Sequence, residues 1–184
     1  MEFNEEDLIK IAKPYLEKCR AGDWNHALRV VKWVKILGKG REDLNLLITA
    51  AYLHDVGWTN VISKGKIDFD KMVKLEPTAN RNTPIFIREV MIKLNFDEKD
   101  IIRVINLVKA ADKRRSEKDD EAILVDSDNL SKVCLEHLSE KYTRESYSKV
   151  FATWEIEFPK RIKTEEGKKR YPQLLRDLKT KLNL

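Results

Sequence analysis

The residues best suited to chemistry in this chain of 184 amino acids are its histidines and the carboxylates near them. His54 and Asp55 stand side by side at the end of an apolar run, where an unpaired imidazole or carboxylate would be costly. His26 precedes them, and Asp126 and Asp128 follow. Imidazole and carboxylate groups together suit a borderline or hard divalent ion, so the sequence indicates a site for Mn²⁺, Fe²⁺, Co²⁺, Ni²⁺ or Zn²⁺.

Two predicted helices would bring the histidines together. The first covers 23–40 with Asp23 as its N-cap, and the second covers 41–57 and ends in a glycine. The second is apolar nearly all round, which predicts a central, buried position. Helices joined by a short glycine-rich turn pack antiparallel, so the start of one lies beside the end of the other. His26 should therefore lie close to His54.

Most of the remaining chain also has apolar residues at helical spacing, and no segment is a convincing strand. The further predicted helices are 4–20, 83–96, 97–113, 126–142, 146–162 and 171–182. Residues 58–84 are polar and contain Gly65 and two prolines, which predicts a long irregular segment able to close over the site as a lid. Pro84 is expected in the first turn of the helix that follows.

These elements predict an all-α protein, a compact single-domain helical bundle over residues 1–184. We place its motif core at about 15–135 and a C-terminal helical extension at 141–184. The run AILVDSD at 122–128 is β-like in composition, but its position before a capped helix favours helix.

The net charge of +5 is unevenly distributed. From Lys141 onward there are 12 Lys/Arg and 6 Asp/Glu residues, whereas the rest of the chain has 24 and 25. Glu165 and Glu166 interrupt the basic run, and aromatic residues are not spaced through it for base stacking. We therefore expect a solvated helix face and, at most, nonspecific binding of nucleic acid.

Membrane and secreted classes do not fit this sequence. No apolar run approaches the ~20 residues of a membrane span, and the N-terminal MEFNEEDLIK is acidic where a secretory signal would be basic. We expect a cytoplasmic protein with no membrane partner. Cys19 and Cys134 lack the CxxC spacing of a zinc site, which favours free, partly buried thiols. Nothing in the sequence indicates an oligomeric state.

Three segments resemble the successive motifs of the HD-domain superfamily, whose members are helical, metal-dependent phosphohydrolases. The segments are NHALRVVKWV, AAYLHDVGW and AILVDSDNLSK. More weakly, RIKTEEGKKRYPQLLRDLKTKL resembles the closing helices of small stand-alone members. The order of the motifs implies four metal ligands in this chain, which are His26, His54, Asp55 and Asp126.

The chain departs from the family pattern in ways that bear on the substrate. It has no histidine between His54 and Asp126, where some members have further metal or phosphate ligands, and this implies a single divalent metal ion. Trp58 stands where deoxynucleotidase-like members have a glutamate, which leaves the substrate open. The basic residues that we expect to bind the substrate phosphate are Arg29, Lys109, Lys113 and Arg114, although a solvated helix end would show the same pattern.

Other interpretations of the same residues stay open. His54 and Asp55 can form a buried hydrogen-bonded pair, and Asp126 or Asp128 can be a helix N-cap. His137 matches no motif, so we expect it at the surface or at a helix cap.

The resemblance implies a metal-dependent phosphohydrolase. Closure of the polar 58–84 segment over the site would exclude bulk water, which favours a small phosphorylated metabolite, such as a nucleotide or a related phosphate ester, over a polymer. Water activated by the metal would attack the phosphorus, and Asp55, in contact with that water, would be the catalytic residue that orients or deprotonates it. The alternative is a non-catalytic module of the same fold that binds a nucleotide, a protein or a nucleic acid.

Overall fold

The computed structural model describes residues 3–62 and 65–183. Over these ranges the chain forms nine α-helices, two short 3-10 helices and no strand, which confirms the predicted all-α class. The α-helices are α1 (Glu5–Leu16), α2 (Asp23–Leu37), α3 (Leu44–Leu53), α4 (Phe69–Lys93), α5 (Glu98–Asp112), α6 (Asp119–Lys132), α7 (Leu135–Lys141), α8 (Tyr147–Arg161) and α9 (Glu165–Leu182). Every helix in the described part is too short or too polar to cross a membrane. Cys19 and Cys134 are free thiols, as predicted.

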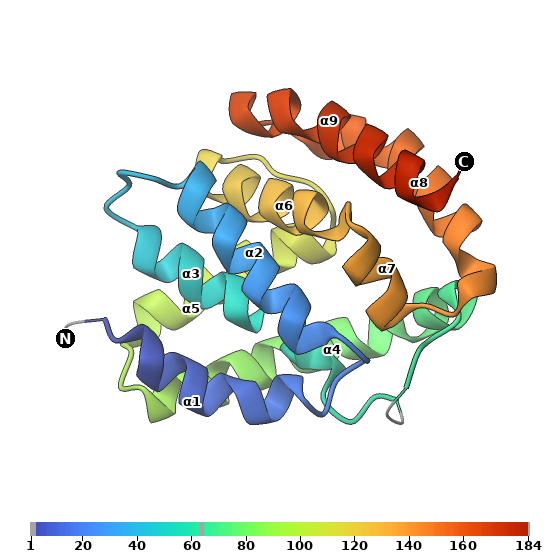
Figure 1. Ribbon diagram of the computed structural model, residues 1–184. Helices are drawn as coiled ribbons and strands as arrows, with labels where there is room; N and C mark the ends of the chain where they lie inside the picture. Colours follow the sequence, from blue (N-terminus) through green and yellow to red (C-terminus); the bar gives the residue numbers. More distant parts are fainter. Residues whose placement is uncertain (1–2, 63–64, 184) are drawn as a thin grey trace.

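Two buried helices, α3 and α6, form the centre of the bundle. Every residue of α3 from Leu47 to Leu53 is buried, as its sequence predicts, and α6 is buried from Ala122 to Ser131. The helix α2 packs against both of them (Figure 1). Each large apolar side chain removed from water in such a core contributes about 1.5–3 kcal/mol to stability. The start of α2, the end of α3 and the middle of α6 are therefore held in fixed relation.

The segment predicted as an irregular lid is mostly helix. Asp68 caps α4, which continues from Phe69 to Lys93 through Pro77 and Pro84. The prediction was wrong because it treated both prolines as signs of irregular chain and placed Pro84 in a first turn. An internal proline costs about 3 kcal/mol, and the burial of the apolar face of α4 against the bundle opposes this cost. Residues 63–64 of the predicted lid lie outside the described residues.

Gly57 lets α4 lie directly against the chain that follows α3. A Cβ atom at Gly57 would be 2.2 Å from the carbonyl oxygen of Ala79 and 2.3 Å from Oγ1 of Thr83. Any side chain here would push α4 away from the 3-10 helix η1 (Val56–Trp58), so this close approach requires glycine. The contact makes α4 one wall of the space beside His54.

Two predicted helix boundaries also differ from the structure. The N-cap of α2 is Gly22 rather than Asp23, whose carboxylate is used in ion pairs described below. The predicted helix 126–142 is two helices, because the backbone leaves helical geometry at Val133 and Cys134. The break lets α7 run in a new direction across the start of α2 (Figure 1).

Asp126, predicted as a metal ligand, instead joins α6 to the turn before α9. Its buried carboxylate accepts hydrogen bonds from the backbone N–H groups of Lys163 and Thr164 and from Oγ1 of Thr164, the last at 2.7 Å. Burial raises the pKa of Asp126, while these donors favour its charged form. Gly167 leaves room for this carboxylate, because a Cβ there would lie 2.9 Å from Oδ2. Asp126 therefore holds the C-terminal helices on the core.

We predict that Asp126→Asn lowers the free energy of unfolding by about 1–3 kcal/mol, because a neutral amide oxygen would replace the charged acceptor and the new NH2 group would face the N–H of Lys163, which lies 3.1 Å from Oδ1. Urea denaturation followed by circular dichroism measures the change. Asp119, exposed in the first turn of the same helix, provides the matched control, and Asp119→Asn should change stability by less than about 0.5 kcal/mol. Equal stability of Asp126→Asn and the wild type would show that this carboxylate does not fasten the two elements.

Candidate metal centre

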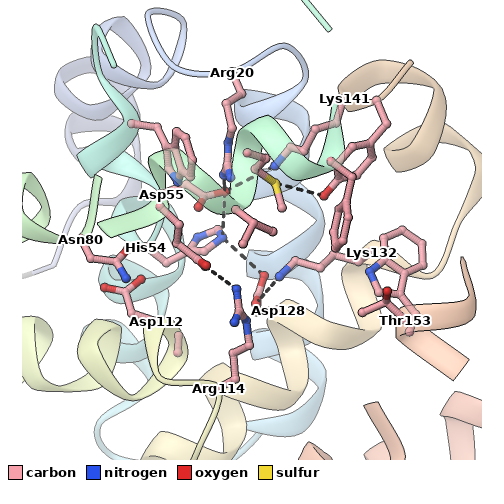
Figure 2. Close-up of a pocket in the computed structure, with 18 of the residues that line it drawn as sticks. Arg20, His54, Asp55, Asn80, Asp112, Arg114, Asp128, Lys132, Lys141 and Thr153 are labelled. Carbon is pink, nitrogen blue, oxygen red and sulfur yellow. Dashed lines mark hydrogen bonds and ion pairs between the residues drawn. The ribbon is translucent and has the colours of Figure 1, made fainter. Parts of the chain in front are cut away.

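Three core helices supply the side chains of the candidate site. His26 lies at the end of the first turn of α2, His54 is the C-cap of α3, and Asp55 follows it. Asp128 comes from the second half of α6. Figure 2 shows His54, Asp55 and Asp128 pointing toward one another, with dashed contacts between them. Both imidazoles and the Asp128 carboxylate are buried, whereas the side chain of Asp55 is 14% exposed.

The donor atoms of these four side chains are close enough to bind one ion. Nε2 of His26 lies 3.0 Å from Nε2 of His54 and 3.1 Å from Oδ1 of Asp128. Oδ2 of Asp55 lies 3.7 and 3.5 Å from the same two nitrogens. Ligand atoms about 2.1 Å from a shared ion are roughly 3.0–3.4 Å apart in octahedral or tetrahedral geometry. The spacing therefore fits, and His26, His54 and Asp128 form the tightest group.

A hydrogen bond behind the ring of His54 directs its Nε2 lone pair into the site. Nδ1 of His54 lies 2.8 Å from the carbonyl oxygen of Ala51 and donates to it. In the neutral ring the proton is then on Nδ1, and Nε2 has a free lone pair that faces His26. This is the ring orientation that a metal-binding histidine needs, with one nitrogen held by a carbonyl group and the other free.

The ring of His26 is held in the same way. Oγ of Ser131 donates to the carbonyl oxygen of Asp128, so it accepts from Nδ1 of His26, 3.3 Å away. Burial and the charge of Lys141 lower the pKa of His26 well below its ordinary value, which keeps the ring neutral. Its Nε2 lone pair then points at that of His54. Two such lone pairs repel at 3.0 Å, and a cation between them removes the repulsion.

Positive side chains keep the two carboxylates of the site ionised. Burial opposes the ionisation of Asp55, but Arg20 at 2.5 Å and Lys141 at 3.6 Å help to hold its pKa well below the ordinary value. Burial likewise opposes the ionisation of Asp128, and Lys132 at 2.6 Å is the main charge that lowers its pKa. Both side chains are therefore anionic ligands throughout the neutral pH range.

Asp23 holds the two cations that face Asp55. Its Oδ1 lies 2.5 Å from Nζ of Lys141, and its Oδ2 accepts a hydrogen bond from Nε of Arg20 at 3.0 Å. The Arg20 guanidinium also lies over the ring of Trp58, 4.0 Å from its centroid. The expected N-cap is thus part of a buried charge network, and Trp58 is a wall of the site.

His54, Asp55 and Asp128 line a cavity with a volume of about 160 Å³. Its walls come from α4, from the end of α5 and from α8, including aromatic rings such as Trp154 and Phe158. Its basic lining residues are Arg20, Arg114, Lys132, Lys141 and Arg161. An ion held by the site would therefore be open to a ligand in a space surrounded by positive charge.

The structure brings Asp128, and not Asp126, to the two histidines. Residues two positions apart on an α-helix point about 200° away from each other, so only one of the pair can face α2. Asp126 faces the turn before α9, and its carboxylate is occupied by Lys163 and Thr164. Sequence reasoning took the first aspartate of the D-x-D pattern, and nothing local to the motif distinguishes the two faces.

Of the four basic residues expected at the substrate, only Arg114 lines the cavity. Arg29 forms a two-pronged ion pair with Glu140. Lys109 is exposed beside a separate hollow between α4 and α5, and Lys113 is exposed at the end of α5. Arg29, Lys109 and Lys113 were misplaced because the sequence does not show which face of each helix is covered by neighbouring elements.

Sequence reasoning missed several residues around the site. His137 was expected at the surface, but it is fully buried and its ring centroid is 4.6 Å from that of His26. Lys141 was counted with the solvated basic quarter, yet it is buried against Asp23. Asp112 and Arg161 line the cavity from α5 and α8. The only available signal was the i, i+4 spacing of His137 and Lys141, which places both on one face of a helix.

The comparison with known families agrees with this geometry. The HD domain model matches residues 23–133, which is more than half of the chain and includes all four candidate ligands. Neither a curated protein nor a solved structure matches the chain. The family match and the joint position of the H…HD…D residues lead to one conclusion, that this chain belongs to the HD-domain family.

Proposed function

We propose that this protein is a metal-dependent phosphohydrolase that acts on a small phosphorylated metabolite. The observation that supports the proposal most strongly is the convergence of His26, His54, Asp55 and Asp128 beside a cavity lined with basic residues. Membership of the HD-domain family supports the same class of reaction. A purely structural metal site would be closed by protein ligands, whereas this one borders a cavity.

The donor set fits one divalent ion from the series Mn²⁺, Fe²⁺, Co²⁺, Ni²⁺ and Zn²⁺. His26 and His54 would contribute imidazole nitrogens, and Asp55 and Asp128 would contribute carboxylate oxygens. When bound, such an ion lowers the pKa of a coordinated water and polarises a phosphoryl oxygen. Four protein ligands leave about two places on a six-coordinate ion for these groups.

The role of Asp55 in this proposal is to position groups rather than to accept a proton. Arg20 and Lys141 hold its carboxylate from one side, and their charges help to keep its pKa well below the ordinary value despite burial. A carboxylate with so low a pKa is a poor general base at neutral pH. Asp55 would therefore fix the ion and orient the attacking water.

Asp112 is the better placed group for proton transfer. It lines the same cavity from the end of α5, and Figure 2 shows its carboxylate next to Asn80. Burial, together with the negative charges of Asp55 and Glu76, raises the pKa of Asp112 to about 7. A group with a pKa near the working pH takes up and releases protons most effectively.

The proposal is tested by phosphate release from a panel of nucleotides and sugar phosphates, together with metal content by atomic emission. We predict that Asp128→Asn and Asp55→Asn each lose most of the bound metal. Their activity should fall by about 100-fold or more, since changes outside the ligand shell already cost 10- to 100-fold. Asp119→Asn is the control that should keep both properties, because it is exposed on the same helix as Asp128.

Asp126→Asn distinguishes the roles of the two aspartates in the D-x-D pattern. Its folded fraction should bind metal with wild-type stoichiometry, because Asp126 faces the turn before α9. Full metal content in Asp128→Asn, or phosphate release by Asp55→Asn at the wild-type rate, would contradict the proposal. A wild-type protein that binds metal but hydrolyses no member of the panel would favour the non-catalytic module instead.

The raised pKa of Asp112 predicts a pH-dependent stability in the chelator-treated protein. Its folded-state pKa of about 7 lies above the ordinary 3.8, so the folded state is favoured while the carboxyl is protonated. That contribution is lost as the pH rises toward 7. Asp112→Asn should therefore raise the Tm relative to the wild type at pH 8, and the difference should be smaller at pH 5 and vanish only below about pH 3.8, the ordinary pKa. A Tm difference that is the same at both pH values would contradict the assignment.

A further inference from the structure

We propose that Arg114 and Arg161 form a second anion site in the cavity, which binds the second phosphate of a substrate carrying two phosphate groups. The inference rests on the proposed function in one respect, because it places the first phosphate at the metal centre. The second site itself is argued from the arrangement of these two side chains.

Arg161 is a largely buried cation with almost no partner. Its side chain, at the end of α8, is only 18% exposed, and it lines the cavity. Its one ion pair in the described part of the chain is at 3.6 Å, to Glu157, whose other carboxylate oxygen is taken by Lys160 at 2.8 Å. A guanidinium has five N–H donors, and the one contact of Arg161, at 3.6 Å, is too long for a good hydrogen bond. Arg161 therefore has donors available to a ligand.

Arg114 brings a second guanidinium to the same place. Its charge acts on Arg161 and, after burial, is the largest influence that lowers the pKa of that residue. Arg114 has a left-handed φ of 56°, which is strained for a residue with a side chain, and it is held by an ion pair with Glu76. Two guanidinium groups that repel each other in a cavity are stabilised by an anion that accepts from both.

The other basic residues of the cavity are already paired. Arg20 and Lys141 hold Asp55 and Asp23, and Lys132 holds Asp128. In the described part of the chain, Arg114 pairs with Glu76 and Arg161 pairs with Glu157 at 3.6 Å, so neither is held by a metal ligand. Both arginines line the same cavity as Asp55 and Asp128, which places them beside the metal centre. One ligand in this cavity can therefore contact both sites.

The charge of the cavity favours two phosphates over one. Five Lys/Arg and four Asp/Glu side chains line it, and a divalent ion would bring the excess to about three positive charges. A phosphate monoester carries about two negative charges near neutral pH. A diphosphate carries about one more, so it is the ligand whose charge matches the cavity.

One of the two arginines lies beyond the family match. The HD domain match ends at residue 133, whereas α8, which supplies Arg161, begins at Tyr147. Asp126 holds the turn that follows α8 on the core, through the backbone of Lys163 and Thr164. The chain beyond the family match is therefore positioned to select the substrate.

The first test measures binding without turnover. Calorimetry on the chelator-treated protein, which keeps the two arginines without the metal, should show binding of inorganic pyrophosphate. Arg161→Gln should weaken this binding by about 10- to 100-fold, the effect of losing hydrogen bonds to a charged group. Lys160→Gln, a change at the adjacent and exposed residue, should leave it intact. Arg161→Lys keeps the charge without the planar fork and should give an intermediate loss.

The second test compares kcat/KM for adenosine monophosphate and adenosine diphosphate in the metal-loaded protein. Arg161→Gln should lower the value for the diphosphate by about 10- to 100-fold and that for the monophosphate by less than about 3-fold. If the wild type shows no turnover but its pyrophosphate binding depends on Arg161, the proposed hydrolase function is contradicted and the proposed anion site is supported. If phosphate esters are hydrolysed and Arg161→Gln affects both nucleotides equally or neither, the anion site is overturned and hydrolysis stands. Equal binding of pyrophosphate by the wild type and Arg161→Gln also overturns it.

Discussion

Two imidazole nitrogens that face each other 3.0 Å apart are the constraint on which this structure depends. Each is turned inward by a hydrogen bond behind its ring, to the carbonyl oxygen of Ala51 in one case and to Ser131 in the other. A packed hydrocarbon core would avoid two buried lone pairs at this distance. Here α2, α3 and α6 are packed so that these atoms meet, together with Oδ1 of Asp128. These atoms are placed so that one cation could bind all of them.

Ion pairs around the site offset the free-energy cost of burying its charged groups. Removing a carboxylate from water costs several kcal/mol unless it is paired. Asp55 is paired with Arg20 and Lys141, which are held in turn by Asp23. This network connects the segment before α2 with the end of α7, two parts of the chain far apart in sequence. The same pairing leaves Asp55 permanently ionised, which suits a ligand and leaves proton transfer to Asp112.

The cavity itself is built mainly by elements that are not part of the ligand-bearing helices. The helix α4 reaches the site because Gly57 lets it approach η1 closely. The helix α8 reaches it because Asp126 holds the next turn on the core. A group suited to proton transfer, two guanidinium groups that no metal ligand holds and the metal ligands thus share one small space. This combination is what the proposed hydrolase would need, and it differs from a closed structural metal site.

The helical class, the central position of α3 and the pairing of His26 with His54–Asp55 could be predicted, because they depend on local periodicity and on a short turn. The choice between Asp126 and Asp128 could not, since it depends on which face of α6 meets α2. The burial of His137 and Lys141 depends on contacts with residues more than 100 positions away, such as His26 and Asp23. The part of α4 up to Pro84 was mistaken for a loop because its prolines were taken as local signs of irregular chain, whereas the packing that opposes their cost is tertiary.

The central claim is that one ion binds between His26, His54, Asp55 and Asp128. An anomalous difference map from crystals grown with Mn²⁺ tests it most directly. The account predicts a single strong peak about 2.1–2.3 Å from Nε2 of both histidines and from a carboxylate oxygen of Asp128, with Asp55 completing the set. A peak at Asp126, or well-ordered side chains in this arrangement with no peak between them at saturating Mn²⁺, would contradict it.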